Sequence, residues 1–197
     1  MRGTPYIYQG EEIGMPNAHF KDINDYRDVE SLNYYEILLK EGKTKEEAIK
    51  TLQERSRDNS RTPMQWSDEK NAGFSDVIPW ISLPDHYKEI NVENELRDED
   101  SIYYFYKKLI ELRKEKEVIQ EGTIEFFEKD DDDLLAYERN YKEEHLVVFN
   151  NLTEKEKEVE IPQLWTSYHK LIGNYDTENM KENKVVLRPY ETLVLEK

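Results

Sequence analysis

The stretch SIYYFYKKLIELRKEKEVIQEGTIEFF, residues 101–127, contains the change in hydrophobic pattern that decides the fold class. Before Gly122, apolar residues recur at helical spacing and predict a helix over residues 98–117. The apolar face of this helix consists of Ile102, Phe105, Leu109 and Leu112. After Gly122, short β-branched and aromatic runs alternate with polar turns. The sequence therefore predicts two domains, residues 1–118 with mixed α and β structure and residues 119–197 with β structure only.

The second predicted domain contains seven short runs that are typical of strands. These runs are Thr123–Phe127, Leu134–Tyr137, Leu146–Phe149, Glu158–Ile161, Tyr168–Ile172, Val185–Leu187 and Thr192–Leu195. Short strands separated by polar turns favour an antiparallel β-sandwich. Four consecutive aspartates at 130–133 raise the alternative of a calcium site. Because adjacent carboxylates do not easily converge on one ion, a solvated hairpin turn is the favoured interpretation.

The first predicted domain contains one strand and several helices. A β-branched and aromatic run predicts a strand over Thr4–Tyr8, and apolar spacing predicts a helix over Val29–Lys40. A capping box that begins at Thr44 predicts a second helix ending near Arg55. Residues 57–91 have no regular periodicity, and their aromatic residues predict a packed loop. Since a lone strand needs neighbours, this part is expected to be the tail of a larger domain or to be completed by a partner.

The composition limits the classes of ligand and location. The chain has 197 residues, of which 37% are hydrophobic and 12% aromatic, and a formal net charge of -16. This charge opposes binding to nucleic acid or to an anionic membrane, and the aromatic content argues against disorder. There is no cysteine, the four histidines show no metal-ligand spacing, and no apolar run approaches the length of a membrane span. We therefore expect a cytoplasmic protein with no cofactor and no metal.

The segment RSRDNSRTPMQW, residues 55–66, is the strongest candidate for a binding site. An arginine such as Arg57 offers a rigid fork of donors that suits a carboxylate or the neighbouring hydroxyls of a sugar. Trp66 could supply an apolar face for a pyranose ring. The competing interpretation, which composition alone favours, is that these arginines pair with the abundant Asp and Glu residues.

Acidic residues supply two further candidates. Glu11 and Glu12 follow the predicted strand and could form a carboxylate pair for acid–base chemistry. Neighbouring side chains at a strand end point in different directions, however, so a salt bridge or a brace within the loop is favoured. Glu30, near the start of a helix, is by default a surface acid that the helix dipole favours.

Several segments considered together resemble one enzyme family. The segments are GTPYIYQGEEIGM at 3–15, DYRDVESLN at 25–33, RDNSRTPMQW at 57–66, NAGFS at 71–75, PWI at 79–81, HYKEINV at 86–92, SIYYFYKKLIELRK at 101–114 and, more weakly, LRPYETLVLE at 187–196. In this order they closely resemble oligo-1,6-glucosidases and related α-glucosidases of glycoside hydrolase family 13. The resemblance extends over essentially the whole chain.

The resemblance implies a fold and assigns roles to two residues. It implies the tail of a (β/α)₈ barrel, with residues 3–9 as the eighth strand, joined to a C-terminal antiparallel β domain. The family's catalytic carboxylates come from barrel strands four, five and seven, and no Asp or Glu in this chain matches those motifs. No catalytic residue is therefore assigned. Arg57 matches an arginine that holds the non-reducing glucose, and Glu30 matches an acid near the sugar on the leaving-group side.

The functional prediction is the C-terminal portion of a retaining α-glucosidase that hydrolyses α-glucosidic bonds, of the α-1,6 type, in short oligosaccharides. The chain alone is expected to be inactive, and to self-associate or to pair with the missing barrel. A second candidate substrate is trehalose 6-phosphate. The competing hypotheses are a non-catalytic carbohydrate-binding or assembly module derived from the family, and an inactive fragment.

Overall fold

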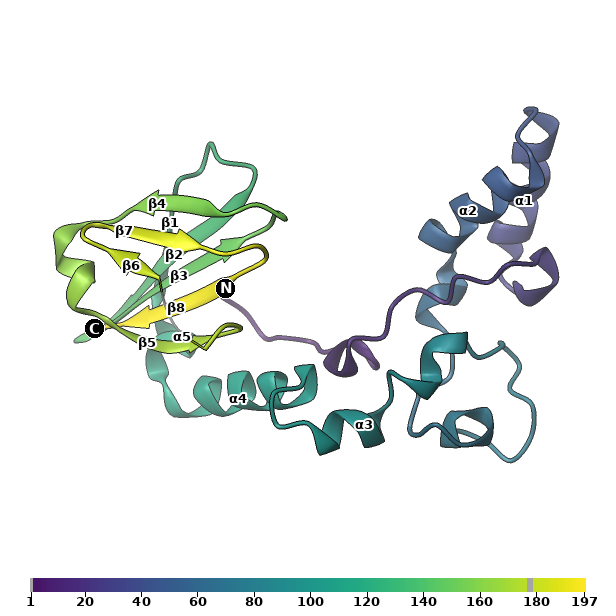
Figure 1. The fold of residues 1–197 in the computed structure, drawn as a ribbon, viewed down its shortest axis with the longest axis horizontal. Helices are drawn as coiled ribbons and strands as arrows, with labels where there is room; N and C mark the ends of the chain where they lie inside the picture. Colours follow the sequence, from purple (N-terminus) through teal and green to yellow (C-terminus); the bar gives the residue numbers. More distant parts are fainter. Residues whose placement is uncertain (1, 177–178) are drawn as a thin grey trace. The chain divides into compact units, whose positions relative to one another are not determined.

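The computed structural model describes residues 2–176 and 179–197. The chain forms two compact units (Figure 1). One unit is Tyr6–Lys107, and the other contains the residues before Tyr6 together with those from Lys108 onward. The predicted domain boundary at residue 118 stays a prediction.

The unit Tyr6–Lys107 is built around two packed helices, α1 at Val29–Lys40 and α2 at Lys45–Arg55. Both predicted helices are confirmed, and so is the capping box: Thr44 accepts a hydrogen bond from the Glu47 amide, and the Glu47 side chain accepts one from the Thr44 amide. The helices enclose the core of this unit. Its buried members are Ala18, Phe20, Tyr26, Tyr35, Leu38, Ala48, Leu52 and Ile81.

The predicted helix over residues 98–117 is wrong in its bounds, because the structure divides this region. Here α3 spans Val92–Arg97, α4 spans Ile102–Glu115 and α5 spans Glu117–Glu121. Asp98 is the C-cap of α3, and its side chain accepts a hydrogen bond from the Asp100 amide, which holds residues 98–100 in a turn. The acidic residues Asp98, Glu99 and Asp100, at the start of the predicted helix, therefore belong to the link between α3 and α4.

The predicted strand over Thr4–Tyr8 is also wrong, because no strand is assigned there (Figure 1). A strand requires a neighbouring backbone to complete its hydrogen-bond ladder. None of the residues that the structure describes pairs with this segment in a ladder. Tyr6 is 90% exposed and Tyr8 is 56% exposed, so the segment is uncovered as well as unpaired.

The segment 57–91 contains only short 3₁₀ turns, as its lack of periodicity predicts. The turns within it are η3 at Arg57–Ser60, η4 at Lys70–Gly73 and η5 at Asp85–Lys88. Two further 3₁₀ turns come earlier, η1 at Glu11–Ile13 and η2 at Ile23–Asp25. The expectation that its aromatic residues are packed is wrong for Trp66, Phe74 and Trp80, which are about half or more exposed.

The second unit is an antiparallel β structure with two sheets (Figure 1). One sheet has the strand order β1-β2-β3-β8-β5, and the other has the order β4-β7-β6. The strands are β1 Thr123–Phe127, β2 Leu134–Tyr141, β3 Glu144–Asn151, β4 Lys157–Glu160, β5 His169–Gly173, β6 Met180–Lys181, β7 Lys184–Leu187 and β8 Thr192–Glu196. All seven predicted runs are confirmed as strands, six of them with shifted ends, and β6 was missed.

One hydrophobic core joins the two sheets of this unit. Its buried members come from β2, β3 and β8 of the first sheet, from β4 and β7 of the second, and from the 3₁₀ turn η6 at Gln163–Ser167 and its flanks. They are Leu134, Ala136, Val147, Phe149, Val159, Ile161, Trp165, Tyr168, Val185, Leu187, Leu193 and Leu195. The alternation of buried and less buried residues along β7 and β8 is that of strands with one face toward a core.

The four aspartates at 130–133 lie in the turn between β1 and β2, which confirms the hairpin interpretation. Asp131 pairs with Lys157 at 2.6 Å rather than with its acidic neighbours. In the described part of the chain, no group of three or more His, Cys, Asp or Glu side chains is placed to hold a metal ion. Among the same residues, no helix combines the length and the apolar character needed to cross a membrane.

Candidate functional site

The helical pair α1–α2 brings together two segments that are distant in sequence. Because the helices are connected by a short link and pack together, the start of α1 lies close to the end of α2. The hydroxyl of Ser31, in the first turn of α1, contacts the hydroxyl of Ser56, just after α2, at 2.8 Å. The segment before α1 and the turn η3 therefore form one polar cluster.

The carboxylate of Asp58 lies at the centre of this cluster and is fully buried. Its Oδ2 accepts hydrogen bonds from the backbone amides of Arg27 and Asp28, at 2.7 and 2.9 Å. Its Oδ1 accepts from Nη2 of Arg61 at 2.7 Å. A buried carboxylate is tolerated when its oxygens are occupied by donors and a cation, and both conditions are met here. Asp58 thus joins the segment before α1 to the turn after α2.

A second buried carboxylate, Asp28, lies beside the first and is only 4% exposed. Its Oδ2 accepts from the amide and the hydroxyl of Ser31, so it caps the N-terminus of α1. Its Oδ1 accepts from Nη2 of Arg57 at 2.8 Å. Burial alone would raise the pKa of Asp28, but the hydrogen bonds from Arg57 and Ser31 outweigh it and lower the pKa below its ordinary value.

The two predicted sugar-binding residues, Arg57 and Glu30, are brought together at the surface of this cluster. Nη2 of Arg57 lies 3.6 Å from Oε2 of Glu30, and the side chains are 66% and 75% exposed. The hydrogen bond and the negative charge of Asp28 raise the pKa of Arg57 above its ordinary value. The competing interpretation of the arginines is also visible, since Arg57 and Arg61 each pair with a buried aspartate. Pairing of Arg57 leaves most of its side chain open to solvent.

Arg57 and Glu30 line a surface depression of about 650 Å³ along α1. Its lining continues from these charged groups to Val29, Tyr34 and Ile37, which are 68%, 43% and 47% exposed. A pyranose ring combines hydroxyl groups with apolar C–H faces, so a polar end beside an apolar strip suits a sugar. Trp66, the predicted apolar platform, does not line this depression. Its role at the site stays a prediction, as do the roles of Arg57 and Glu30.

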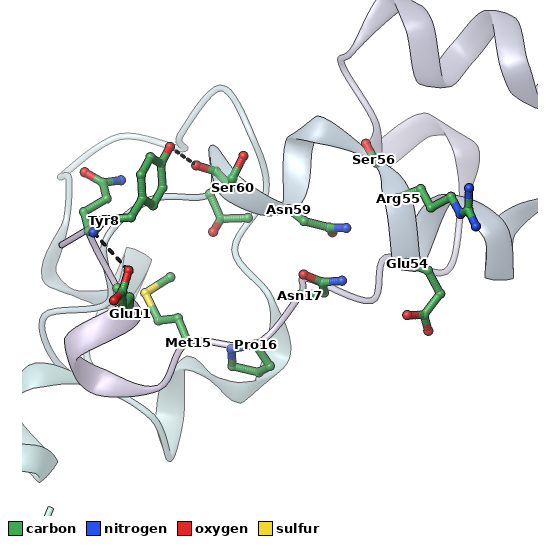
Figure 2. Close-up of a pocket in the computed structure, with 13 residues that line it drawn as sticks. Tyr8, Glu11, Met15, Pro16, Asn17, Glu54, Arg55, Ser56, Asn59 and Ser60 are labelled. Carbon is green, nitrogen blue, oxygen red and sulfur yellow. Dashed lines mark hydrogen bonds between the residues drawn. The ribbon is translucent and has the colours of Figure 1, made fainter. Parts of the chain in front are cut away.

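A second depression, of about 390 Å³, lies beside the candidate acid–base pair (Figure 2). Here Glu11 accepts from the Tyr8 amide at 3.1 Å, and Glu12 accepts from the Gly10 amide at 2.8 Å. Glu11 also accepts from the hydroxyl of Tyr106 at 2.6 Å, which lowers the pKa of Glu11. Burial and this contact raise the pKa of Tyr106 to about 12. Both carboxylates therefore brace the loop, which confirms the favoured interpretation.

Sequence reasoning missed Asp28 and the serines, and it placed Asp58 in a hydrogen-bonded cluster with the neighbouring arginines without predicting its burial. Asp28 could have been found by its position directly before a predicted helix, where aspartate is a preferred N-cap. Asp58 gave no such signal, because nothing in the motif RDNS shows which residue is buried.

The fold described above is that of α-amylase-type glycoside hydrolases. Residues 1–122 match the family described as "Alpha amylase, catalytic domain", and residues 134–194 match the "Alpha-amylase SusG C-terminal domain". The chain therefore belongs to the α-amylase family, glycoside hydrolase family 13. The predicted family and fold class, a part of the catalytic domain followed by a C-terminal antiparallel domain, are confirmed.

The relatives include enzymes with two different names. The chain is 45% identical to an oligo-1,6-glucosidase of Bacillus cereus and 44% identical to a trehalose-6-phosphate hydrolase of Bacillus subtilis (strain 168). Each match covers 98% of this chain and 35% of the relative. Among solved structures, the chain is similar to the crystal structure of a Bacillus licheniformis trehalose-6-phosphate hydrolase, mutant R201Q, in complex with PNG. The TM-score is 0.94 and the sequence identity is 49%. The match covers 100% of this chain and 36% of that chain. The chain thus spans about a third of the length of these relatives.

Proposed function

We propose that this chain is the C-terminal portion of a retaining α-glucosidase that acts on α-1,6-glucosidic bonds in short oligosaccharides. Its contribution is to bind the sugar through Arg57 and Glu30. The observation that carries the proposal is the exposed Arg57–Glu30 pair held on a frame of buried carboxylates, beside an apolar strip. The 45% identity to an oligo-1,6-glucosidase supports this substrate.

The second candidate substrate is trehalose 6-phosphate. The structural match to a trehalose-6-phosphate hydrolase, at 49% identity, favours it. Both substrates present a glucose unit with free hydroxyl groups to the enzyme, so the Arg57–Glu30 pair is compatible with either. They differ in the phosphate, and that difference is the basis of the test.

We further propose that the 197 residues alone do not catalyse hydrolysis. A retaining glycosidase needs two carboxyl groups about 5–5.5 Å apart, one as nucleophile and one as acid and base. In the polar cluster, Asp28 and Asp58 are buried with their oxygens occupied by hydrogen bonds. Glu30 is 75% exposed and lies 3.6 Å from Arg57, and no second free carboxylate of the cluster faces it. None of the three is placed as a catalytic acid.

The test uses the chain alone and the chain grafted into a relative. In the grafted enzyme, this chain replaces the matching segment of the Bacillus cereus oligo-1,6-glucosidase. We expect the chain alone to release no p-nitrophenol from p-nitrophenyl α-glucoside, and the grafted enzyme to hydrolyse isomaltose. Preferred hydrolysis of trehalose 6-phosphate would favour the second substrate. A folded grafted enzyme inactive on both would contradict the proposed function, and turnover by the pure chain would contradict the proposed inactivity.

The role of Arg57 is tested by Arg57→Ala in the grafted enzyme. We expect kcat/KM to fall roughly 10- to 100-fold, because a donor fork to the sugar is lost. The matched control is Arg97→Ala, which removes an exposed arginine paired with Glu93 on α3 and should leave kcat/KM unchanged. An unchanged kcat/KM with a lowered melting temperature in Arg57→Ala would show that Arg57 is a structural brace.

We also propose that the chain self-associates or pairs with the remainder of a barrel, and that it acts in the cytoplasm with an α-gluco-oligosaccharide as its ligand. Support for association comes from Tyr6, Ile7 and Tyr8, which are exposed and lack a ladder partner among the described residues. An unpaired backbone next to exposed apolar side chains favours pairing with another chain.

A further inference from the structure

We propose that Asp28 is a positioning residue that acts through Arg57, fixing the guanidinium in the direction from which it meets the sugar. The inference rests on the proposed function, because it assigns a role within the same site. It predicts that Asp28, which lines the depression but is only 4% exposed and has both carboxylate oxygens hydrogen-bonded within the protein, controls how well the site captures glucose.

The two carboxylate oxygens of Asp28 have different hydrogen-bond partners, Ser31 for Oδ2 and Arg57 for Oδ1. Oδ2 is occupied by the amide and the hydroxyl of Ser31, at 3.0 and 2.9 Å, and this fixes the carboxylate plane relative to α1. Oδ1 remains for Arg57, whose Nη2 lies 2.8 Å away. Nη2 of Arg61 lies 3.5 Å from the same oxygen, so a second cation faces it. Asp28 therefore presents one oriented, charged acceptor to Arg57.

The position of Asp28 is itself fixed by its contacts with Asp58 and with Ser31. Its backbone amide donates to the buried carboxylate of Asp58 at 2.9 Å. The hydroxyl of Ser31 also contacts that of Ser56, and Ser56 accepts from the Asp58 amide at 3.1 Å. These contacts form a closed chain between the start of α1 and the turn η3. Because it is buried and fully hydrogen-bonded, the acceptor for Arg57 is held rigidly.

Arg57 depends on this acceptor because the rest of its side chain is solvent-exposed. Apart from Asp28, its nearest acidic partner is Glu30, at 3.6 Å and 75% exposed. An exposed arginine side chain has many rotamers, and a mobile surface acid restricts them little. Without Asp28, we expect the guanidinium to turn toward Glu30 and to sample several orientations. The N–H donors of Arg57 would then be oriented toward a bound sugar for a smaller fraction of the time.

A purely structural role for Asp28 is the main competing explanation, because Asp28 also caps α1. The substitution Asp28→Ser separates the two roles. Serine is as good an N-cap as aspartate, so the helix start is retained, but its side chain is shorter and uncharged and does not present a charged acceptor to Arg57. The substitution Asp28→Ala removes both the cap and the acceptor.

The first test is a double-mutant cycle in the grafted enzyme. We expect Asp28→Ser to lower kcat/KM about 10-fold when Arg57 is present, and by less than about 2-fold when Arg57 is already alanine. The control Arg97→Ala should show no coupling with Asp28→Ser. Equal losses in both backgrounds would overturn the proposal, because they would show that Asp28 acts independently of Arg57.

The second test uses the 197-residue chain itself and does not depend on activity. Side-chain ¹⁵N NMR should show restricted rotation of the Arg57 guanidinium in the unmodified chain, and faster rotation by about 10-fold or more in Asp28→Ser. Glu30→Gln should leave the rotation restricted. Free rotation in the unmodified chain, or restricted rotation in Asp28→Ser, would overturn the inference. An inactive grafted enzyme with the expected NMR result would contradict the proposed function and leave the positioning of Arg57 supported.

Discussion

Removing the carboxylate of Asp58 should destabilise the unit Tyr6–Lys107 far more than removing any exposed acid. The perturbation is Asp58→Ala. It leaves the buried backbone amide of Asp28 and the part-buried amide of Arg27 without their acceptor, and it leaves Arg61 without the partner at 2.7 Å. The two amides cannot turn toward solvent without displacing the N-cap of α1, because Asp28 is itself that cap.

The expected loss follows from these three contacts. A buried donor left unsatisfied costs about 1–3 kcal/mol, which applies in full to the Asp28 amide and in part to the part-buried Arg27 amide, so the two amides together account for about 2–4 kcal/mol. Arg61 is 39% exposed and can recover much of its hydration, so its share is small. We therefore expect a loss of about 2–4 kcal/mol.

The assay is urea unfolding of the chain, followed by the fluorescence of Trp66 and Trp80, which both lie in this unit. Trp165 lies in the other unit and would add its own fluorescence to the signal. The substitution Trp165→Phe is therefore introduced into both the parent chain and the Asp58→Ala variant. The matched control is Asp68→Ala, which removes an exposed acid and should change the free energy of unfolding by less than about 0.5 kcal/mol. A loss below about 1 kcal/mol for Asp58→Ala would refute the reasoning.

Three further outcomes are expected. Thr44→Ala should lower the free energy of unfolding by about 1 kcal/mol, because it removes the N-cap of α2; Thr51→Ala in the middle of the same helix should cost less, and an equal loss would contradict the capping argument. Phe149→Ala should cost about 3–5 kcal/mol in urea unfolding followed by Trp165 fluorescence, since Phe149 is fully buried between the sheets; a cost below about 1 kcal/mol would refute this. Light scattering should give a mass above the 23.7 kDa of one chain, and the double substitution Tyr6→Lys, Ile7→Lys should restore the monomer mass; a monomeric unmodified chain would contradict self-association.

Local signals in the sequence predicted the helices wherever capping and periodicity agreed. The bounds of α1 and α2 follow from apolar spacing and from the capping box at Thr44. The start of α4 was misplaced by four residues, because acidic residues near a helix start are equally consistent with a turn closed by Asp98. The short helix α3 was missed, although Asn91 caps it by accepting from the Asn94 amide. Six residues are too few to show a helical period.

Features that depend on distant residues were harder to predict. The run Thr4–Tyr8 has the composition of a strand, but composition does not supply the neighbour that a strand needs. The strands of the β unit were predicted well because each run pairs with another within the same unit. The two-residue strand β6 was missed because it is too short to show alternation.

The candidate site shows the same division between what is local and what depends on folding. The residue type of Arg57 and its motif predicted a binding role, because a guanidinium suits hydroxyl groups wherever it is exposed. The sequence did not show that Asp28 and Asp58 are the buried members of the cluster, since burial arises only when α1 and α2 pack together.

This arrangement supports the proposal that the polar cluster serves binding as well as stability. A cluster built only for stability would have no reason to leave its outer arginine two-thirds exposed, because a solvated ion pair adds little to folding. Here the buried acids hold a cation at the rim of a depression, with a second exposed charge, Glu30, beside it. Rigid buried acceptors hold an exposed donor in one orientation before the ligand arrives. Binding of a neutral sugar then costs less conformational entropy, because the side chains of the site are already ordered. Under the proposed function, the exposed pair and the buried frame form one unit, in which the buried carboxylates provide rigidity and Arg57 and Glu30 are proposed to contact the sugar.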